Sequence, residues 1–224
     1  LSVWLLNEQT QVGVFEAGIS QPGEMQALRD IIQPTIGVLT NLGQAHQENF
    51  PSMAAKSKEK LALFHDTDAV VYCMDDELVS RCMSEFAYHG EQLSWSFKNR
   101  KAAFFVKDIT KKDINTTVSY VYKGKTECSY TLPFIDDASI SNSIACAIVA
   151  LHLGMKPEEL AQRMPKLEPV AMRLEVKEGQ HGCTLINDSY NSDINSLDIA
   201  LDFMARRPDH KGRKRTVILS DIFQ

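Results

Sequence analysis

The sequence predicts an α/β protein with a mostly parallel, doubly wound sheet. Through residues 11–86, apolar runs of strand length alternate with amphipathic stretches of helical period. The runs are short and nearly continuously apolar, as expected for parallel strands that helices cover on both faces. Over residues 92–134 apolar and polar residues alternate instead, so we expect antiparallel hairpins appended to the sheet.

The first half of the chain supplies the expected parallel elements. Ser52 is a suitable N-cap for the second helix, because its hydroxyl can accept a hydrogen bond from an unpaired N–H of the first turn. Strands are expected at residues 11–15 (QVGVF), 35–40 (TIGVLT) and 69–73 (AVVYC), and helices at residues 23–30, 52–64 and 75–86.

The second half supplies the hairpins, two helices and a new run of strands. Gly154 is an expected C-cap, and Pro157 is expected in the first turn of a helix. We place a domain boundary near Pro169, between residues 1–169 and residues 170–224. Further helices are expected at residues 139–154, 157–164 and 194–204, and strands at residues 173–179 (RLEVKEG), 183–188 (CTLIND) and 216–220 (TVILS).

The composition argues against several functional classes. The 224 residues carry a net charge of −5 and form no long basic stripe, so nucleic-acid binding is not expected. No apolar run approaches the ~20 residues of a membrane-spanning helix and no signal peptide is visible, so we expect a cytoplasmic protein without a membrane partner. The five cysteines form no CxxC pair and resemble small buried hydrophobes. Because the chain begins without Met and ends after an apolar run, we expect a fragment.

Two polar clusters follow the first two expected strands, at the end where α/β sheets bind ligands. Glu16, in FEAGIS, can hold a magnesium ion that bridges nucleotide phosphates, or it can simply face solvent. His46 lies in TNLGQAHQENF, where an imidazole can bind a metal or a phosphate, or be an ordinary polar loop residue.

Two further clusters lie on a helix and after a later strand. Lys56, Lys58 and Lys60 would normally be a solvated helix face, but Lys60 precedes the apolar LALF and should lie nearer the sheet, where a lysine can react. In INDSYNSDINSL (186–197), Asp188 can accept hydrogen bonds from ribose hydroxyls and Tyr190 can stack on a base. An N-cap with an Asx-turn is the structural alternative there.

The order of these four clusters, with MRLE (172–175) before the last, resembles the Mur ligase family over essentially the whole chain. The resemblance implies ATP and Mg²⁺ as cofactors. It implies catalytic or metal-binding functions for Glu16, His46 and Lys60, the last being the lysine that many members carbamylate. It also implies that Arg173 reaches the phosphates, that Asp188 binds the ribose, and that Asn142, Tyr190 and Asn191 lie beside the nucleotide.

The DSYN turn (188–191) and the stretch GEMQALRDIIQPTIGVLTNLG resemble one branch of the family. That branch uses ATP to join D-alanyl-D-alanine to UDP-N-acetylmuramoyl-tripeptide through an acyl phosphate, and we expect a monomer. Residues 1–169 then correspond to the central ATP-binding domain and residues 170–224 to the start of a Rossmann-like C-terminal domain. Two alternatives are a related ligase such as folylpolyglutamate synthase and a non-catalytic nucleotide-binding scaffold.

The sequence departs from the family pattern in several places. Ala138-Ser139 stands where His-Asn is frequent, Phe50-Pro51 where Phe-Gly is common, and DSYNSDI (188–194) where DSYNANP is common. The largest departure is that the sequence contains no GxxGK[S/T] motif, whose backbone amides and lysine hold nucleotide phosphates. We therefore expect the chain by itself to be inactive.

Overall fold

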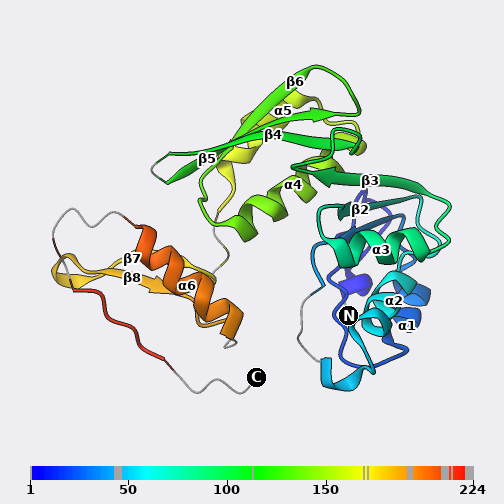
Figure 1. Cartoon of the computed structure of the whole chain (residues 1–224), viewed down its shortest axis with the longest axis horizontal. Coiled ribbons are helices and arrows are strands. Elements are labelled where there is room, and N and C mark those ends of the chain that lie inside the picture. The colour runs from blue at the N-terminus through cyan, green and yellow to red at the C-terminus, as the bar shows by residue number, and fades with distance from the viewer. Residues whose placement is uncertain are drawn as a thin grey trace. The chain divides into compact units, whose positions relative to one another are not determined.

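The computed structural model of the protein describes residues 2–42, 47–112, 114–168, 170, 172–190, 194–207, 212 and 214–219. The chain divides into two compact units, Leu1–Lys166 and Leu167–Gln224 (Figure 1). The predicted domain boundary at Pro169 falls on a residue outside the described part of the chain, so it stays a prediction.

The first unit is built on a six-stranded sheet whose strands follow one another in chain order. The first four strands pair in parallel and the last three pair antiparallel, so the predicted α/β class with a mostly parallel sheet is confirmed. We call β1–β3 the parallel half and β4–β6 the antiparallel half. The strands are β1 (Ile36–Leu39), β2 (Ala69–Cys73), β3 (Glu91–Ser96), β4 (Phe104–Lys112), β5 (Asn115–Tyr122) and β6 (Glu127–Leu132).

Helices cover both faces of the sheet (Figure 1). In β2 the adjacent residues Val70 and Val71 are both fully buried on opposite faces, which explains why AVVYC is apolar without alternation. One face packs against α1 (Glu24–Ile32), α2 (Met53–Ala62) and α3 (Glu77–Glu85), and the other against α4 (Asp137–His152) and α5 (Pro157–Arg163).

The helix ends follow local side-chain chemistry. As predicted, Ser52 caps α2, its hydroxyl accepting a hydrogen bond of 3.1 Å from the N–H of Ala55. The predicted C-cap of α4 is wrong by one residue, because Leu153 occupies that position. Gly154 follows it with φ of 94°, a left-handed conformation that glycine adopts without steric cost.

Three strand predictions need correction. Residues 11–15 are irregular, with Val12 and Val14 largely exposed, and residues 216–219 form no strand although they are apolar. An apolar run becomes a strand only when a neighbour accepts its backbone hydrogen bonds, and neither run has one among the described residues. The region expected to form only hairpins begins with β3, which pairs in parallel with β2 and β4.

The described residues of the second unit form one small sheet and one long helix. Strand β7 (Glu175–Glu178) pairs antiparallel with β8 (Thr184–Asn187), and α6 (Ile194–Arg206) follows. None of the described helices combines the length and the apolar composition that a membrane span requires. The short 3-10 helices of the two units are η1 (Ser2–Leu5), η2 (Gln47–Asn49), η3 (Met164–Lys166) and η4 (Gln180–Gly182).

Candidate functional site

The carboxyl end of β1 meets α2 through Lys60. The ammonium group of Lys60 donates a hydrogen bond of 3.3 Å to the backbone carbonyl of Asn41, two residues beyond the strand. The side chain is half-buried, and burial lowers the pKa of Lys60 from its usual value, with the positive charge of Lys56 acting in the same direction. Lys60 therefore lies at the expected edge of the sheet, and its ammonium group loses a proton more readily than that of an exposed lysine.

Lys56 is a buried lysine that the sequence analysis missed. Its side chain is only 2% exposed, whereas Lys58 is exposed. Burial lowers the pKa of Lys56, and the negative charge of Glu48 opposes that change. Its four-residue spacing from Lys60 was the available signal, because residues four apart share one face of a helix.

Glu16 lies in an irregular segment and not at a strand end, so that part of the prediction is wrong. Its side chain is exposed and makes no hydrogen bond or ion pair with another described residue. The start of α1, which follows Glu16 in the chain, is fixed to α2. The Glu59 carboxylate accepts hydrogen bonds from the N–H groups of Gly23 (2.7 Å) and Met25 (3.2 Å).

The carboxyl ends of β2 and β3 are tied to each other. The Asp75 carboxylate accepts hydrogen bonds from the Ser96 hydroxyl at 2.5 Å and from the Phe97 N–H at 2.7 Å. The Ser96 oxygen in turn accepts hydrogen bonds from the N–H groups of Lys98 and Asn99. Asp75 is therefore occupied in holding the β3–β4 loop.

Three of the predicted nucleotide residues come together in the second unit. The Arg173 guanidinium carbon lies 4.3 Å from the centre of the Tyr190 ring, a cation–π arrangement. Asp188 accepts a hydrogen bond of 3.0 Å from the N–H of Leu174, and the N–H of Tyr190 donates to the carbonyl of Met172 at 3.2 Å. The turn after β8 and the segment before β7 therefore hold each other.

The other predicted residues are less constrained by the structure. Asn142 is exposed on α4 of the first unit. His46 and Asn191 lie outside the described residues, so their predicted functions stay predictions.

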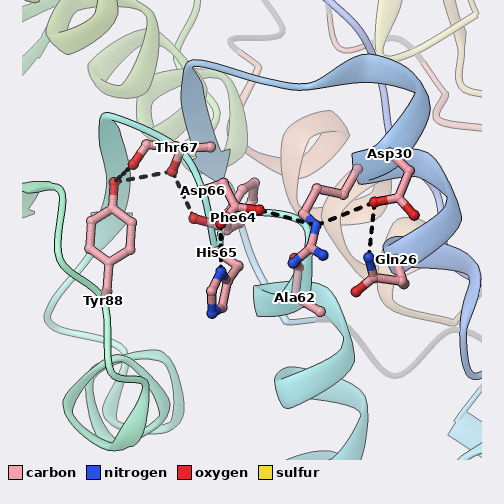
Figure 2. Close-up of polar contacts among 9 residues, drawn as sticks. Gln26, Asp30, Ala62, Phe64, His65, Asp66, Thr67 and Tyr88 are labelled. Atoms are coloured by element: carbon pink, nitrogen blue, oxygen red, sulfur yellow. Dashed lines mark hydrogen bonds and ion pairs between the residues drawn. The ribbon is translucent and has the colours of Figure 1, made fainter.

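A second polar network lies at the opposite, amino end of the parallel strands (Figure 2). The Arg29 guanidinium lies 3.5 Å from Asp66, and the ring of His65 hydrogen-bonds the same carboxylate at 2.7 Å and lowers the pKa of Asp66. The Tyr88 hydroxyl donates to the carbonyl of Thr67 at 2.9 Å. This network lines part of an open depression of about 570 Å³. It ties helix ends to strand starts, away from the strand ends where α/β sheets bind ligands.

The described donor groups fit the implied cofactors in part. Glu16 offers a carboxylate, and the neutral amine of Lys60 can be carbamylated to give an oxygen ligand. Within the described ranges, no three or more His, Cys, Asp or Glu side chains lie close enough together to hold a metal ion. Tyr190 exposes 54% of its surface, enough for a planar ring to stack on it. Asp188 keeps a second carboxylate oxygen to which no described residue donates.

Comparison with known proteins connects these features. The model of the Mur ligase middle domain matches residues 3–150. The UDP-N-acetylmuramoyl-tripeptide–D-alanyl-D-alanine ligase of Bacillus subtilis is 23% identical over the whole chain. A crystal structure of MurF from Acinetobacter baumannii superposes with a TM-score of 0.78 at 19% identity, over 91% of this chain and 44% of that one. MurF ligase from Thermotoga maritima, solved in complex with ADP, gives a TM-score of 0.69 at 20% identity, over 84% and 43%.

The chain spans about half the length of these relatives, 47% of the Bacillus subtilis protein. At such identities the two crystal structures establish the fold alone. The matched fold contains both the α2 region with Lys60 and the sheet that positions it.

Proposed function

Since this chain belongs to the Mur ligase family through its middle domain, we propose that the protein containing it is an ATP-dependent ligase that joins D-alanyl-D-alanine to UDP-N-acetylmuramoyl-tripeptide. The names of the curated relatives support this substrate pair. The reaction would form an acyl phosphate on the tripeptide carboxylate, which the amine of D-alanyl-D-alanine then attacks. ADP and phosphate would leave, and an amide bond would form.

The observation that carries the proposal is the environment of Lys60. Lowering the pKa of a half-buried lysine increases the neutral fraction of its amine, and the neutral amine can add to carbon dioxide and lose one proton to give an anionic carbamate. Hydrogen bonding to the carbonyl of Asn41 keeps that nitrogen at the carboxyl end of β1. Together with Glu16 and His46, a carbamylated Lys60 would supply the oxygen and nitrogen ligands for Mg²⁺. Bound Mg²⁺ would neutralise negative charge on the phosphoryl group that ATP supplies.

The second unit would bind the nucleotide. Arg173 carries a fixed positive charge suited to phosphate oxygens, and its stacking on Tyr190 orients it. The free oxygen of Asp188 would accept hydrogen bonds from ribose hydroxyls. By family resemblance, Asn142 and Asn191 would lie beside the nucleotide as well.

The proposal includes three statements about the whole protein. Residues 1–169 would form the central ATP-binding domain and residues 170–224 the beginning of the C-terminal domain. The protein would act as a monomer in the cytoplasm, where its nucleotide substrates are made. Light scattering of the purified full-length protein would test the monomer, and a dimer mass would contradict it.

An assay of phosphate release by the full-length protein tests the substrate pair. With ATP and Mg²⁺, we expect release that requires both UDP-N-acetylmuramoyl-tripeptide and D-alanyl-D-alanine. Release with a folate and glutamate in their place would favour the folylpolyglutamate synthase alternative. Binding of ATP without turnover on either pair would favour the non-catalytic scaffold.

The 224-residue chain by itself should release no phosphate, because its sequence lacks the GxxGK[S/T] motif that holds nucleotide phosphates. The same assay, run on this chain at matched concentration beside the full-length protein, measures that difference. Turnover by the chain alone would contradict this prediction without affecting the substrate assignment.

A further inference from the structure

Arg173 lies in a strained stretch of backbone that the proposed function leaves unexplained. Met172 has a φ of 60° and Leu174 a φ of 48°, so a left-handed residue stands on each side of Arg173. In a residue with a Cβ, this conformation brings the side chain and the backbone too close together. It persists only where the surrounding groups hold it, and such residues gather at functional sites. Neighbouring groups must therefore hold the backbone on both sides of Arg173.

Two carboxylates hold these two strained residues. The Glu175 carboxylate accepts a hydrogen bond of 3.3 Å from the N–H of Met172. The Asp188 carboxylate accepts one of 3.0 Å from the N–H of Leu174. The carbonyl of Met172 is held as well, because it accepts a hydrogen bond of 3.2 Å from the N–H of Tyr190. Since hydrogen bonds to a charged acceptor are stronger than neutral ones, the two carboxylates offset the strain.

Glu175 is itself fixed at the beginning of β7. Its side chain is 19% exposed, and one carboxylate oxygen lies 2.8 Å from the ammonium group of Lys177. Asn187 is its partner in the β7–β8 register, and the Asn187 side chain donates a hydrogen bond of 3.5 Å to the other oxygen. That second oxygen is the one that accepts from Met172. The strand pair thus aims the Glu175 carboxylate at the backbone that precedes Arg173.

We propose that Glu175 is a positioning residue for Arg173, which holds the N–H of Met172 and so keeps the strained backbone that places the Arg173 guanidinium on the Tyr190 ring. The inference rests on the proposed function, in which Arg173 binds phosphate oxygens. Arg173 is exposed, so the direction of its long side chain depends on the backbone that carries it. Displacing a binding group by about 1 Å can lower a reaction rate by about 100-fold. Glu175 would act without touching nucleotide or substrate.

The test is the ATP dependence of ligation by the full-length protein. Glu175→Ala should lower kcat/KM for ATP by about 10–100-fold. Because Glu175 acts through Arg173, the double variant with Arg173→Ala should be no slower than Arg173→Ala alone. Losses that multiply in the double variant would show that Glu175 acts elsewhere, and would overturn the proposal. Glu178→Ala removes an exposed carboxylate from the same strand and is the matched control, with unchanged kinetics expected.

Two conservative variants separate the hydrogen bond from the charge. Glu175→Gln keeps the side-chain length and an acceptor oxygen for the N–H of Met172, so it should retain most of the activity. Glu175→Asp keeps the charge but withdraws the oxygen from that N–H, so its loss should approach that of Glu175→Ala. Both variants keep a polar side chain beside Asn187, and they provide the comparison if Glu175→Ala folds poorly. An active Glu175→Asp with an inactive Glu175→Gln would overturn the proposal.

A measurement without catalysis separates this inference from the proposed function. In NMR spectra of the 224-residue chain, the face of the Tyr190 ring should shift the side-chain protons of Arg173 upfield, and Tyr190→Leu identifies that shift by removing it. Glu175→Ala should reduce the shift, whereas Glu178→Ala should leave it. A full-length protein without ligase activity would contradict the proposed function. An unchanged Arg173 shift in Glu175→Ala would contradict the positioning of Arg173 by Glu175.

Discussion

The two halves of the six-stranded sheet use their polar side chains in different places. In the parallel half, the polar contacts of the candidate site lie beyond the carboxyl ends of the strands, where Lys60 meets Asn41 and Asp75 meets Ser96. The network around Asp66 lies at the amino ends of the same strands. In the antiparallel half, Tyr120 and Tyr130 lie inside the core beneath α4. Parallel strands bring all their carboxyl ends to one edge, whereas antiparallel strands alternate their ends. The parallel half therefore builds one region for chemistry, and the antiparallel half contributes packing.

If the parallel half carries the chemistry and the antiparallel half the packing, substitutions in the parallel half should lower activity and substitutions in the antiparallel half should lower stability. The largest effect is expected for Lys60→Met in the full-length ligase. Loss of the nitrogen that hydrogen-bonds Asn41 should lower the ligation rate by about 10²–10³-fold, as for other losses of one electrostatic contact at a reacting centre. The melting temperature should barely move. Lys58→Met, exposed on the same helix, is the control, and equal activity of both variants would remove Lys60 from the site.

The converse change lies in the antiparallel half. Leu132 of β6 is fully buried in the core against α4 and α5. Leu132→Ala should lower the free energy of unfolding by about 2–5 kcal/mol, because it leaves a cavity, while the ligation rate per folded molecule stays unchanged. Urea denaturation measures the first quantity. Ser129→Ala, exposed on the same strand, should change neither, and a loss of specific activity in Leu132→Ala would break the division.

The smallest effect concerns two buried tyrosine hydroxyls. Tyr130 shares a hydrogen bond of 3.2 Å with Ser143, whereas the Tyr120 hydroxyl is buried without a hydrogen-bond partner in the described part of the chain. Tyr120→Phe should therefore raise the free energy of unfolding by about 1 kcal/mol, and Tyr130→Phe should lower it by about as much. Thermal unfolding of the two variants at neutral pH compares them directly, and destabilisation by Tyr120→Phe would indicate a partner for that hydroxyl.

The same tyrosine gives a pH dependence. Burial raises the pKa of Tyr120 to about 12 from its ordinary value of 10.0. Between these values the unfolded chain has lost the proton and the folded chain keeps it, so the unfolded state gains stability as pH rises. The wild-type protein should lose stability from about pH 10 towards pH 12 more steeply than Tyr120→Phe. Parallel unfolding curves for the two proteins over that range would contradict the raised pKa.

The elements that sequence patterns predicted well are those with local causes. The buried run AVVYC became β2, and the Ser52 hydroxyl caps α2 as expected. Strand direction has no local cause, so β3 was expected in a hairpin and instead pairs in parallel with β2. Residues 11–15 have the apolar alternation of a strand, but no described neighbour pairs with them.

The residues of the candidate site also differ in how far the sequence alone could identify them. Lys60 was identified from its place before an apolar run, and the structure brings it to the carbonyl of Asn41. Lys56 was missed because a lysine in a charged helix is usually solvated, and only the fold reveals that its side chain is buried. The contact between Arg173 and Tyr190 joins residues on two segments that a strand pair separates, which sequence spacing alone does not reveal.

The position of β1 at one end of the sheet order has a practical consequence for handling the chain. Within the described residues β1 pairs only with β2, so one side of its backbone offers free N–H and C=O groups. Val38 on this strand is 38% exposed, and nothing charged lies within IGVL to discourage a second copy from adding to it. An open, apolar strand edge is a template for self-association. Purification of the isolated chain should therefore favour low protein concentration, and a lysine at Val38 is the substitution to try for solubility.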